Sequence, residues 1–131
     1  MKENKKPEIR LAFKVFFTRH QLSTIDSCLK KYAVDGFKYH YSRLYDSYSV
    51  SIFEETIKSF YFGNALREFL SHRCNDLNVL LADSAFECQG IEIDAWIEYF
   101  DVFPSLDIPA DCIIVASSIN ASISIDTHID T

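Results

Sequence analysis

The chain has very little glycine. Only three of its 131 residues are glycine, at positions 36, 63 and 90. A dinucleotide-binding G-x-G-x-x-G turn and a phosphate-binding P-loop both need glycines placed close together. These three are too far apart for either motif, so the sequence excludes nucleotide binding by those two routes.

Close cysteine pairs and long apolar runs are also absent. The four cysteines form no C-x-x-C pair, which disfavours a zinc ribbon or a thioredoxin-type site. The first seven residues are charged rather than apolar, and no run approaches 18 apolar residues. These features argue against a secretion signal and a membrane span. The sequence therefore predicts a cytoplasmic protein with reduced, buried thiols, with disulfides as the alternative.

Recognisable catalytic and metal-binding patterns are missing. The histidines are scattered, no G-x-S-x-G elbow is present, and no set of four metal ligands has a suitable spacing. Glu92 and Asp94 share one face of a predicted strand and could serve acid–base chemistry. Without another catalytic group, such a pair is more typical of an exposed acidic face. We therefore expect no catalytic residues, no metal and no cofactor, and predict that the protein is not an enzyme.

Lysine and arginine are absent from the C-terminal part of the chain, residues 74–131. All 13 Lys and Arg residues lie between Lys2 and Arg73, whereas residues 74–131 carry 11 acidic residues. The first 73 residues have 13 bases and 8 acids, so the halves carry +5 and −11 and the whole chain −6. This asymmetry predicts either a basic partner or two halves that neutralise each other. The overall acidity argues against nucleic acid as the partner.

Hydrophobic periodicity predicts alternating strands and helices. The predicted strands span residues 8–18, 37–41, 47–53, 91–101 and 121–126, and the predicted helices begin at Ser23, Asn64 and Asp107. Asp26 lies three residues after Ser23, which resembles a capping box. Residues 64–82 favour one long or kinked helix, although a helix followed by a short strand stays open. Residues 54–62 are ambiguous between a strand end and a helical turn.

This order predicts one α+β domain covering residues 1–131, with residues 1–7 flexible. We expect a mainly antiparallel or mixed sheet with helices packed on one face, in a ferredoxin-like arrangement.

One predicted strand combines negative charge with large aromatic rings. Period-2 alternation places Glu92, Asp94, Trp96, Glu98 and Phe100 on the same face. Tryptophan is the residue most enriched at binding hot spots, and carboxylates attract a basic protein. We therefore predict a partner-binding patch of Glu92, Asp94, Trp96, Glu98, Phe100 and Asp101. The alternative is that helices cover this face and that both aromatic rings belong to the core.

The stretch from Gly90 to Asp130 resembles a widespread bacterial family of small domains of unknown function. It reads GIEIDAWIEYF and then SLDIPADCIIVASSINASISIDTH, which is a strand, a proline-opened helix and a short strand that closes on an aspartate. The strand predicted from Ile9 to Phe17 also fits that pattern. The size, the acidity and the absence of a catalytic motif are similar to immunity proteins of contact-dependent inhibition and polymorphic toxin systems. That resemblance implies a protein that neutralises a basic cognate toxin by occlusion.

A second interpretation is a small-molecule-binding or regulatory domain. In it, the sheet and helices enclose an aromatic pocket lined by Tyr39, Tyr41 and Tyr48. The sequence leaves open the identity of the partner, the oligomeric state and which sheet face is exposed.

Overall fold

The computed structural model describes residues 4–130 and has the predicted order of elements. The elements are β1 (Glu8–Phe17), a 3-10 turn (Arg19–Gln21), α1 (Leu22–Lys31), β2 (Lys38–Ser42), β3 (Ser47–Lys58), α2 (Phe62–Leu81), β4 (Gly90–Tyr99), α3 (Ala110–Ser118) and β5 (Ala121–Ile129). The predicted α+β class is confirmed. Residues 1–7 are predicted to be flexible, and the first three of them lie outside the described residues. At Pro7 the backbone is already held, because its carbonyl accepts a hydrogen bond of 3.1 Å from the Ser59 N–H.

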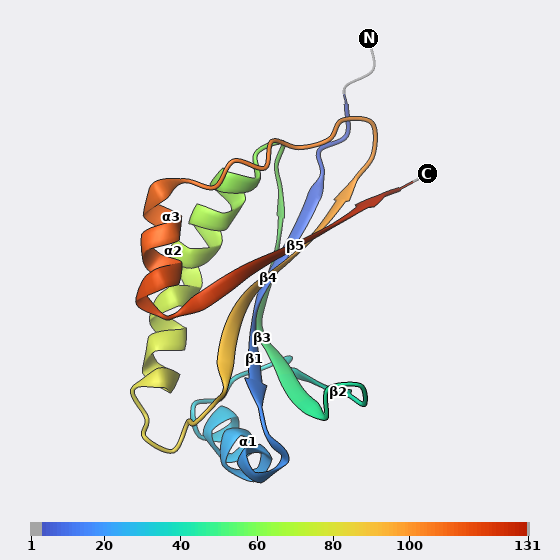
Figure 1. Ribbon diagram of the computed structural model, residues 1–131. Helices are drawn as coiled ribbons and strands as arrows, with labels where there is room; N and C mark the ends of the chain where they lie inside the picture. The colour runs from blue at the N-terminus through green and yellow to red at the C-terminus, as the bar shows by residue number, and fades with distance from the viewer. Residues whose placement is uncertain (1–3, 131) are drawn as a thin grey trace.

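The five strands form one mixed sheet in the order β2-β3-β1-β4-β5. The pairs β2–β3, β3–β1 and β1–β4 are antiparallel, and only β4–β5 is parallel. Because β3 lies between β1 and β2, the elements from β1 to β4 make the split βαβ arrangement of ferredoxin-like folds. The helix α3 then carries the chain back so that β5 is added beside β4 (Figure 1).

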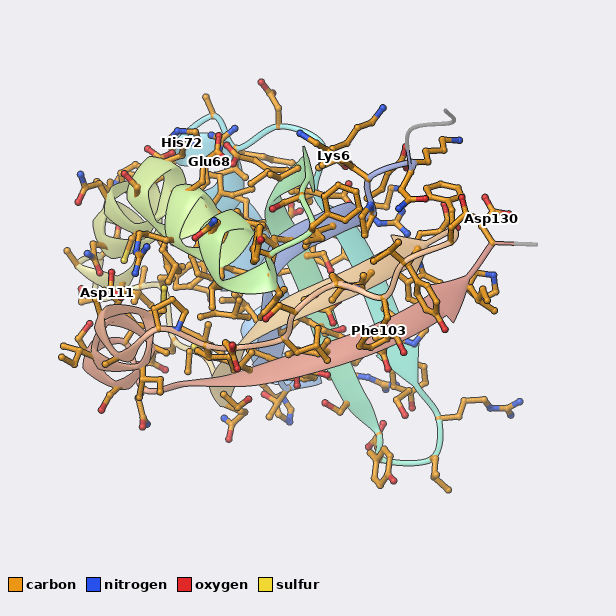
Figure 2. The ribbon with its side chains drawn as sticks, turned by 90° about the horizontal axis from the view of Figure 1, so that it is seen from above. Lys6, Glu68, His72, Phe103, Asp111 and Asp130 are labelled. Carbon is orange, nitrogen blue, oxygen red and sulfur yellow. The ribbon has the colours of Figure 1, made fainter. Side chains whose placement is uncertain are left out.

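The helices lie on one face of this sheet, as predicted (Figure 1). The side chains of β1 that point toward the helices, from Ile9 to Phe17 at every second residue, are all buried. The ring of Phe13 packs against Phe69 of α2, with ring centroids 4.9 Å apart. Alternation along β1 and β4 thus places one row of apolar side chains in the core, as expected for a sheet covered on one side. In Figure 2, Glu68 and His72 of α2 and Asp111 of α3 lie at the end of the molecule opposite Asp130.

A bulge in β3 resolves the ambiguous segment after residue 53. Phe53 has a positive φ of 57°, and the β1–β3 register shifts between Leu11 and Phe13. Beyond the bulge the strand continues to Lys58. There Glu55 lies beside α2 and pairs with Arg73 at 3.0 Å and His72 at 3.3 Å. A bulge inserts one residue and shifts the alternation, which is why the period-2 pattern fades at this point.

The predicted capping box at Ser23 and Asp26 is wrong. A 3-10 turn comes before α1, and the N–H of Thr18 donates to the side-chain oxygen of Gln21 at 3.0 Å. Asp26 lies within the helix, where it pairs with Lys30 at 2.8 Å and accepts a hydrogen bond from the Tyr39 hydroxyl at 2.6 Å.

The second helix starts earlier than the predicted Asn64 cap. It begins at Phe62, whose N–H donates to the Ser105 carbonyl at 2.8 Å. Gly63 then lies against the segment that leads into α3. A Cβ at this position would come within 2.6 Å of the Asp107 carbonyl oxygen and 2.9 Å of Pro109 Cδ. From this start α2 runs unbroken to Leu81, which confirms the single long helix.

Within residues 4–130, no helix is both long enough and apolar enough to cross a membrane.

Candidate functional site

Within residues 4–130, no helix covers the sheet face opposite α2 and α3 (Figure 1), and we call this face the open face. Its central part consists of alternate residues of three neighbouring strands, which the strand registers place side by side. They are Glu8, Arg10, Ala12, Lys14 and Phe16 of β1, Glu92, Asp94, Trp96 and Glu98 of β4, and Ser122, Ser124, Asp126 and His128 of β5. The alternate residues of β4 that point the other way, Ile91, Ile93, Ala95 and Ile97, are buried. The open face is therefore the polar side of the sheet.

Four of the six predicted contact residues meet on this face. Glu92, Asp94, Trp96 and Glu98 are spaced at every second residue of β4, and the Trp96 side chain is 38% exposed. The alternative that helices bury Trp96 is therefore excluded. Phe100 follows the end of β4, is half-buried and lies under Lys5, whose Nζ is 4.1 Å from the ring centroid. Asp101 is exposed in the loop that follows.

The last strand contributes two further residues that the sequence reasoning did not assign. Asp126 pairs in register with Trp96, and His128 pairs with Glu98. The imidazole of His128 stacks on the Trp96 ring at a centroid distance of 5.7 Å. From the other side, the Arg10 guanidinium lies 6.0 Å from the same ring. Trp96 is thus flanked by side chains from both neighbouring strands. The alternating pattern of residues 121–126 predicts a strand. It does not predict that this strand pairs in parallel with β4.

The carboxylates of this region form a group that we call the acidic strip, made of Glu92, Asp94, Glu98 and Asp126. Within residues 4–130, none of the four takes part in an ion pair. Partial burial, followed by repulsion from Asp94, raises the pKa of Glu92. Burial also raises the pKa of Asp94, where attraction to Lys14 opposes the shift and Asp126 adds to it. The charged forms of both groups are therefore less stable here than in water.

A pocket on the helix side of β2 and β3 brings together part of the predicted tyrosine cluster. It has a volume of about 470 Å³ and is lined by Arg19, Leu22, Ser23, Asp26, Tyr39 and Tyr48. Burial, and then the hydrogen bond to Asp26, raises the pKa of Tyr39. Tyr41 lies outside the lining, with its ring 4.7 Å from that of Tyr48 and its hydroxyl donating to Asp46 at 2.6 Å.

The cysteines have the properties of structural thiols. All four are free, and burial is the main cause that raises the pKa of each. A raised pKa leaves less of the reactive thiolate at neutral pH. In the part of the chain from residue 4 to 130, no group of three His, Cys, Asp or Glu side chains is placed to hold a metal ion.

Comparisons of the chain with family models, with curated proteins and with solved structures find no match.

Proposed function

We propose that this protein is an immunity-type binding protein that covers a basic site on a cognate toxin and blocks it by occlusion. The observation that carries the proposal is the acidic strip beside an exposed tryptophan on the open face. Asp94, Glu98 and Asp126 neighbour Trp96, and Glu92 extends the row along β4. Within residues 4–130, none of the four carboxylates has an ion-pair partner.

Part of the acidic surface outside the strip is neutralised by cations of the same chain. Asp83 pairs with Lys31 at 3.0 Å, and Asp111 pairs with Arg67 at 2.8 Å. Glu92 and Asp94 are instead partly buried beside other carboxylates, which destabilises their charged forms. A Lys or Arg from a partner would relieve this repulsion. Charge complementarity of this kind mainly speeds association and selects the partner.

Trp96 supplies the apolar part of the same surface. Its ring is supported by His128 at 5.7 Å and Arg10 at 6.0 Å, so its position is held before a partner arrives. A supported aromatic ring loses little conformational entropy on binding, which favours slow dissociation. An inhibitor needs both properties, because it must capture a toxin quickly and release it slowly.

The proposal is tested by retention of a partner from a lysate of the source cells. Tagged wild-type protein is compared with the double variant Asp94→Lys/Glu98→Lys. The matched control is Asp35→Lys/Glu87→Lys, which makes the same charge change at two exposed loop residues outside the open face. We expect one basic protein to be retained by the wild type and the control but lost by the strip variant. Washing with about 1 M NaCl should also release it, because the Debye length falls to about 3 Å.

The second arm tests the blocking itself. The purified partner is assayed for its own activity, for example nuclease activity, with equimolar wild-type protein or strip variant. Inhibition by the wild type alone supports occlusion. Equal retention of proteins by all three baits contradicts the use of the strip, and a bound partner that keeps its full activity contradicts the immunity role.

A second candidate function is small-molecule binding in the pocket beside Tyr39 and Tyr48. A volume of about 470 Å³ lies within the usual range for ligand pockets. Arg19 and Asp26 give it one cation and one anion, which suits a zwitterionic or amphipathic metabolite. A metabolite that raises the melting temperature of the wild type but not of Tyr39→Ala would favour this function. No response from any metabolite in a broad library would argue against it.

A further inference from the structure

The strand β5 forms a free edge of the sheet. It is the last strand in the order β2-β3-β1-β4-β5, and in Figure 1 no other segment crosses in front of it. One side of β5 pairs with β4 over the whole strand, from Ala121 to Ile129. No strand among residues 4–130 pairs with its other side. An edge of this kind is a template for another strand.

The hydrogen-bond pattern shows which backbone groups are free. The N–H of Asp130 donates to the carbonyl of Tyr99 at 2.8 Å, and Tyr99 lies opposite Ile129. In a parallel ladder the groups that bond to the neighbouring strand belong to every second residue. Even-numbered residues of β5 therefore bond to β4. The odd-numbered residues, from Ala121 to Ile129, direct their N–H and C=O groups outward.

This edge lacks the features that usually prevent strand addition. It is nine residues long and contains no lysine, no arginine and no proline. The opposite edge of the sheet, β2, has only five residues and begins with the exposed Lys38. Short length and an edge lysine are two common means of blocking edge-to-edge pairing. Of the two strands at the ends of the sheet order, β5 is therefore the one that offers a long edge without these features.

Apolar side chains accompany the free edge on the helix side of the sheet. Ile123 and Ile125 are only half-buried, although they point toward the core, and Ile129 is 49% exposed. Two residues mark the side of α3 that faces α2: Cys112 is buried, and Val115 lines a pocket shared with α2. At 100° per residue, Ile113 then points away from α2, above the β5 edge. Ile113 is 54% exposed. A strand added to β5 would bury Ile113 together with the isoleucines of β5.

We propose that two copies of this chain form a twofold-symmetric dimer in which their β5 strands pair antiparallel about Ile125. The sequence of β5 is self-complementary in that register. Ile125 faces Ile125 of the second copy, Ile123 faces Thr127, and Ala121 faces Ile129, all on the helix side. Each of these residues has outward N–H and C=O groups, so every such pair forms two hydrogen bonds. The two sheets become continuous, and the two α3 helices come side by side with Ile113 between them.

The polar side of the strand fits the same register. Ser124 faces Asp126 of the second copy, and Ser122 faces His128. No carboxylate lies directly opposite another, although the two Asp126 side chains are diagonal neighbours. A shift of the axis to Asp126 would place like charges directly opposite each other, which destabilises a cross-strand pair. The charge pattern thus favours the axis at Ile125, and the dimer leaves the β4 part of the acidic strip accessible.

Sedimentation equilibrium between about 10 and 200 µM tests the dimer, because association depends on concentration. The wild type should approach twice the 15.1 kDa mass of one chain. Thr127→Pro removes an outward N–H, breaks no bond to β4, and should remain monomeric. Thr127→Val keeps the N–H and should dimerise as the wild type does. Circular dichroism and thermal unfolding confirm that both variants are folded.

Mild oxidation of cysteine variants tests the register. In a hydrogen-bonded antiparallel pair the Cα atoms are about 5.5 Å apart, within the range of a disulfide. Ile125→Cys should therefore cross-link two chains, whereas Ile123→Cys, four residues from its counterpart, and the wild type with its four native cysteines should not. A wild type that stays monomeric at all concentrations overturns the proposal. A dimer that survives Thr127→Pro, or that cross-links equally through Ile123→Cys, overturns it as well.

Discussion

At the scale of single residues, Trp96 is a large aromatic side chain that contributes to a surface rather than to the core. Replacing it with alanine should lower the free energy of unfolding by only about 1 kcal/mol, because the residue lies on the open face and is 38% exposed. The dissociation rate of a bound partner should rise by about 30-fold, as a loss of about 2 kcal/mol at a hot spot implies. Urea denaturation and binding kinetics measure the two effects.

Phe69→Ala is the matched comparison. The Phe69 ring is fully buried against Phe13, and its loss should lower the free energy of unfolding by about 3–5 kcal/mol. If Trp96→Ala destabilises the protein as much as Phe69→Ala does, Trp96 is part of the core and the open face is misassigned.

Asp83 joins α1 to the end of α2 through its charge. Its carboxylate accepts hydrogen bonds from the Tyr32 hydroxyl at 2.7 Å, the Ala85 N–H at 3.0 Å and Lys31 Nζ at 3.0 Å. These bonds lower the pKa of Asp83 from 3.8 to about 2, with the Tyr32 hydroxyl as the largest cause. Because the pKa of Asp83 is lower in the folded state than in the unfolded chain, the charged carboxylate stabilises the fold. This stabilisation is complete above about pH 4 and is lost as the pH falls to about 2.

Asp83→Asn should therefore destabilise the protein at neutral pH, and its difference from the wild type should shrink between about pH 4 and pH 2. Urea denaturation across this range measures the difference. The control is Asp35→Asn, an exposed loop residue without an ion pair within residues 4–130. A difference between Asp83→Asn and the wild type that stays constant down to pH 2 would rule out this linkage.

At the scale of elements, Gly63 determines how closely α2 approaches the segment before α3. Gly63→Ala gains helix propensity but places a methyl group 2.6 Å from the Asp107 carbonyl oxygen. We expect a net loss of about 1–3 kcal/mol in the free energy of unfolding, as for other overpacked sites. Asn64→Ala, one residue later and exposed, should be neutral or slightly stabilising. Equal unfolding midpoints for the two variants in urea would show that the segment containing Asp107 and Pro109 shifts to accommodate the methyl group without loss of stability.

The sequence predicts the elements well where one face is buried and poorly where the backbone turns. The alternation of β1 and β4 is clear because their odd-numbered residues meet the helices. The positive φ of Phe53 has no local signal, since the residue is not glycine, so the extension of β3 to Lys58 stayed ambiguous. The true start of α1 was missed because the turn at Thr18 and Gln21, rather than Ser23, comes before the helix.

The candidate site shows the same division between local and long-range information. Period 2 alone places Glu92, Asp94, Trp96 and Glu98 on one face of a strand. Whether that face is covered depends on where α2 and α3 pack, which no local pattern contains. His128 lies two residues beyond the strand predicted for residues 121–126, yet it belongs to β5 because that strand pairs with β4 as far as Tyr99. Residues 30 or more apart in the sequence meet only through this parallel register.

At the scale of the whole molecule, the fold neutralises part of the charge asymmetry and leaves part of it exposed. The basic first half contributes β1, which lies next to the acidic β4, so that Lys14 is opposite Glu92 and Arg10 is opposite Trp96. Ion pairs such as Lys31–Asp83 and Arg67–Asp111 also join the two halves. Within residues 4–130, the acidic strip has no such pairs. Mutual neutralisation of the two halves therefore accounts for part of the surface, and the basic partner that we propose concerns the strip alone.

Salt should consequently shift the two proposed associations in opposite directions. Binding of a basic partner joins unlike charges, so raising NaCl from about 0.05 to 0.5 M should slow association by about tenfold or more and change dissociation little. Pairing of two β5 strands joins like charges, including the two Asp126 side chains, so the same change should tighten the dimer. Binding kinetics and sedimentation equilibrium measure the two effects. A partner association rate that does not change with salt removes electrostatic steering. A dimer weakened by salt shows that its interface depends on ion pairs, which a β5–β5 contact does not contain.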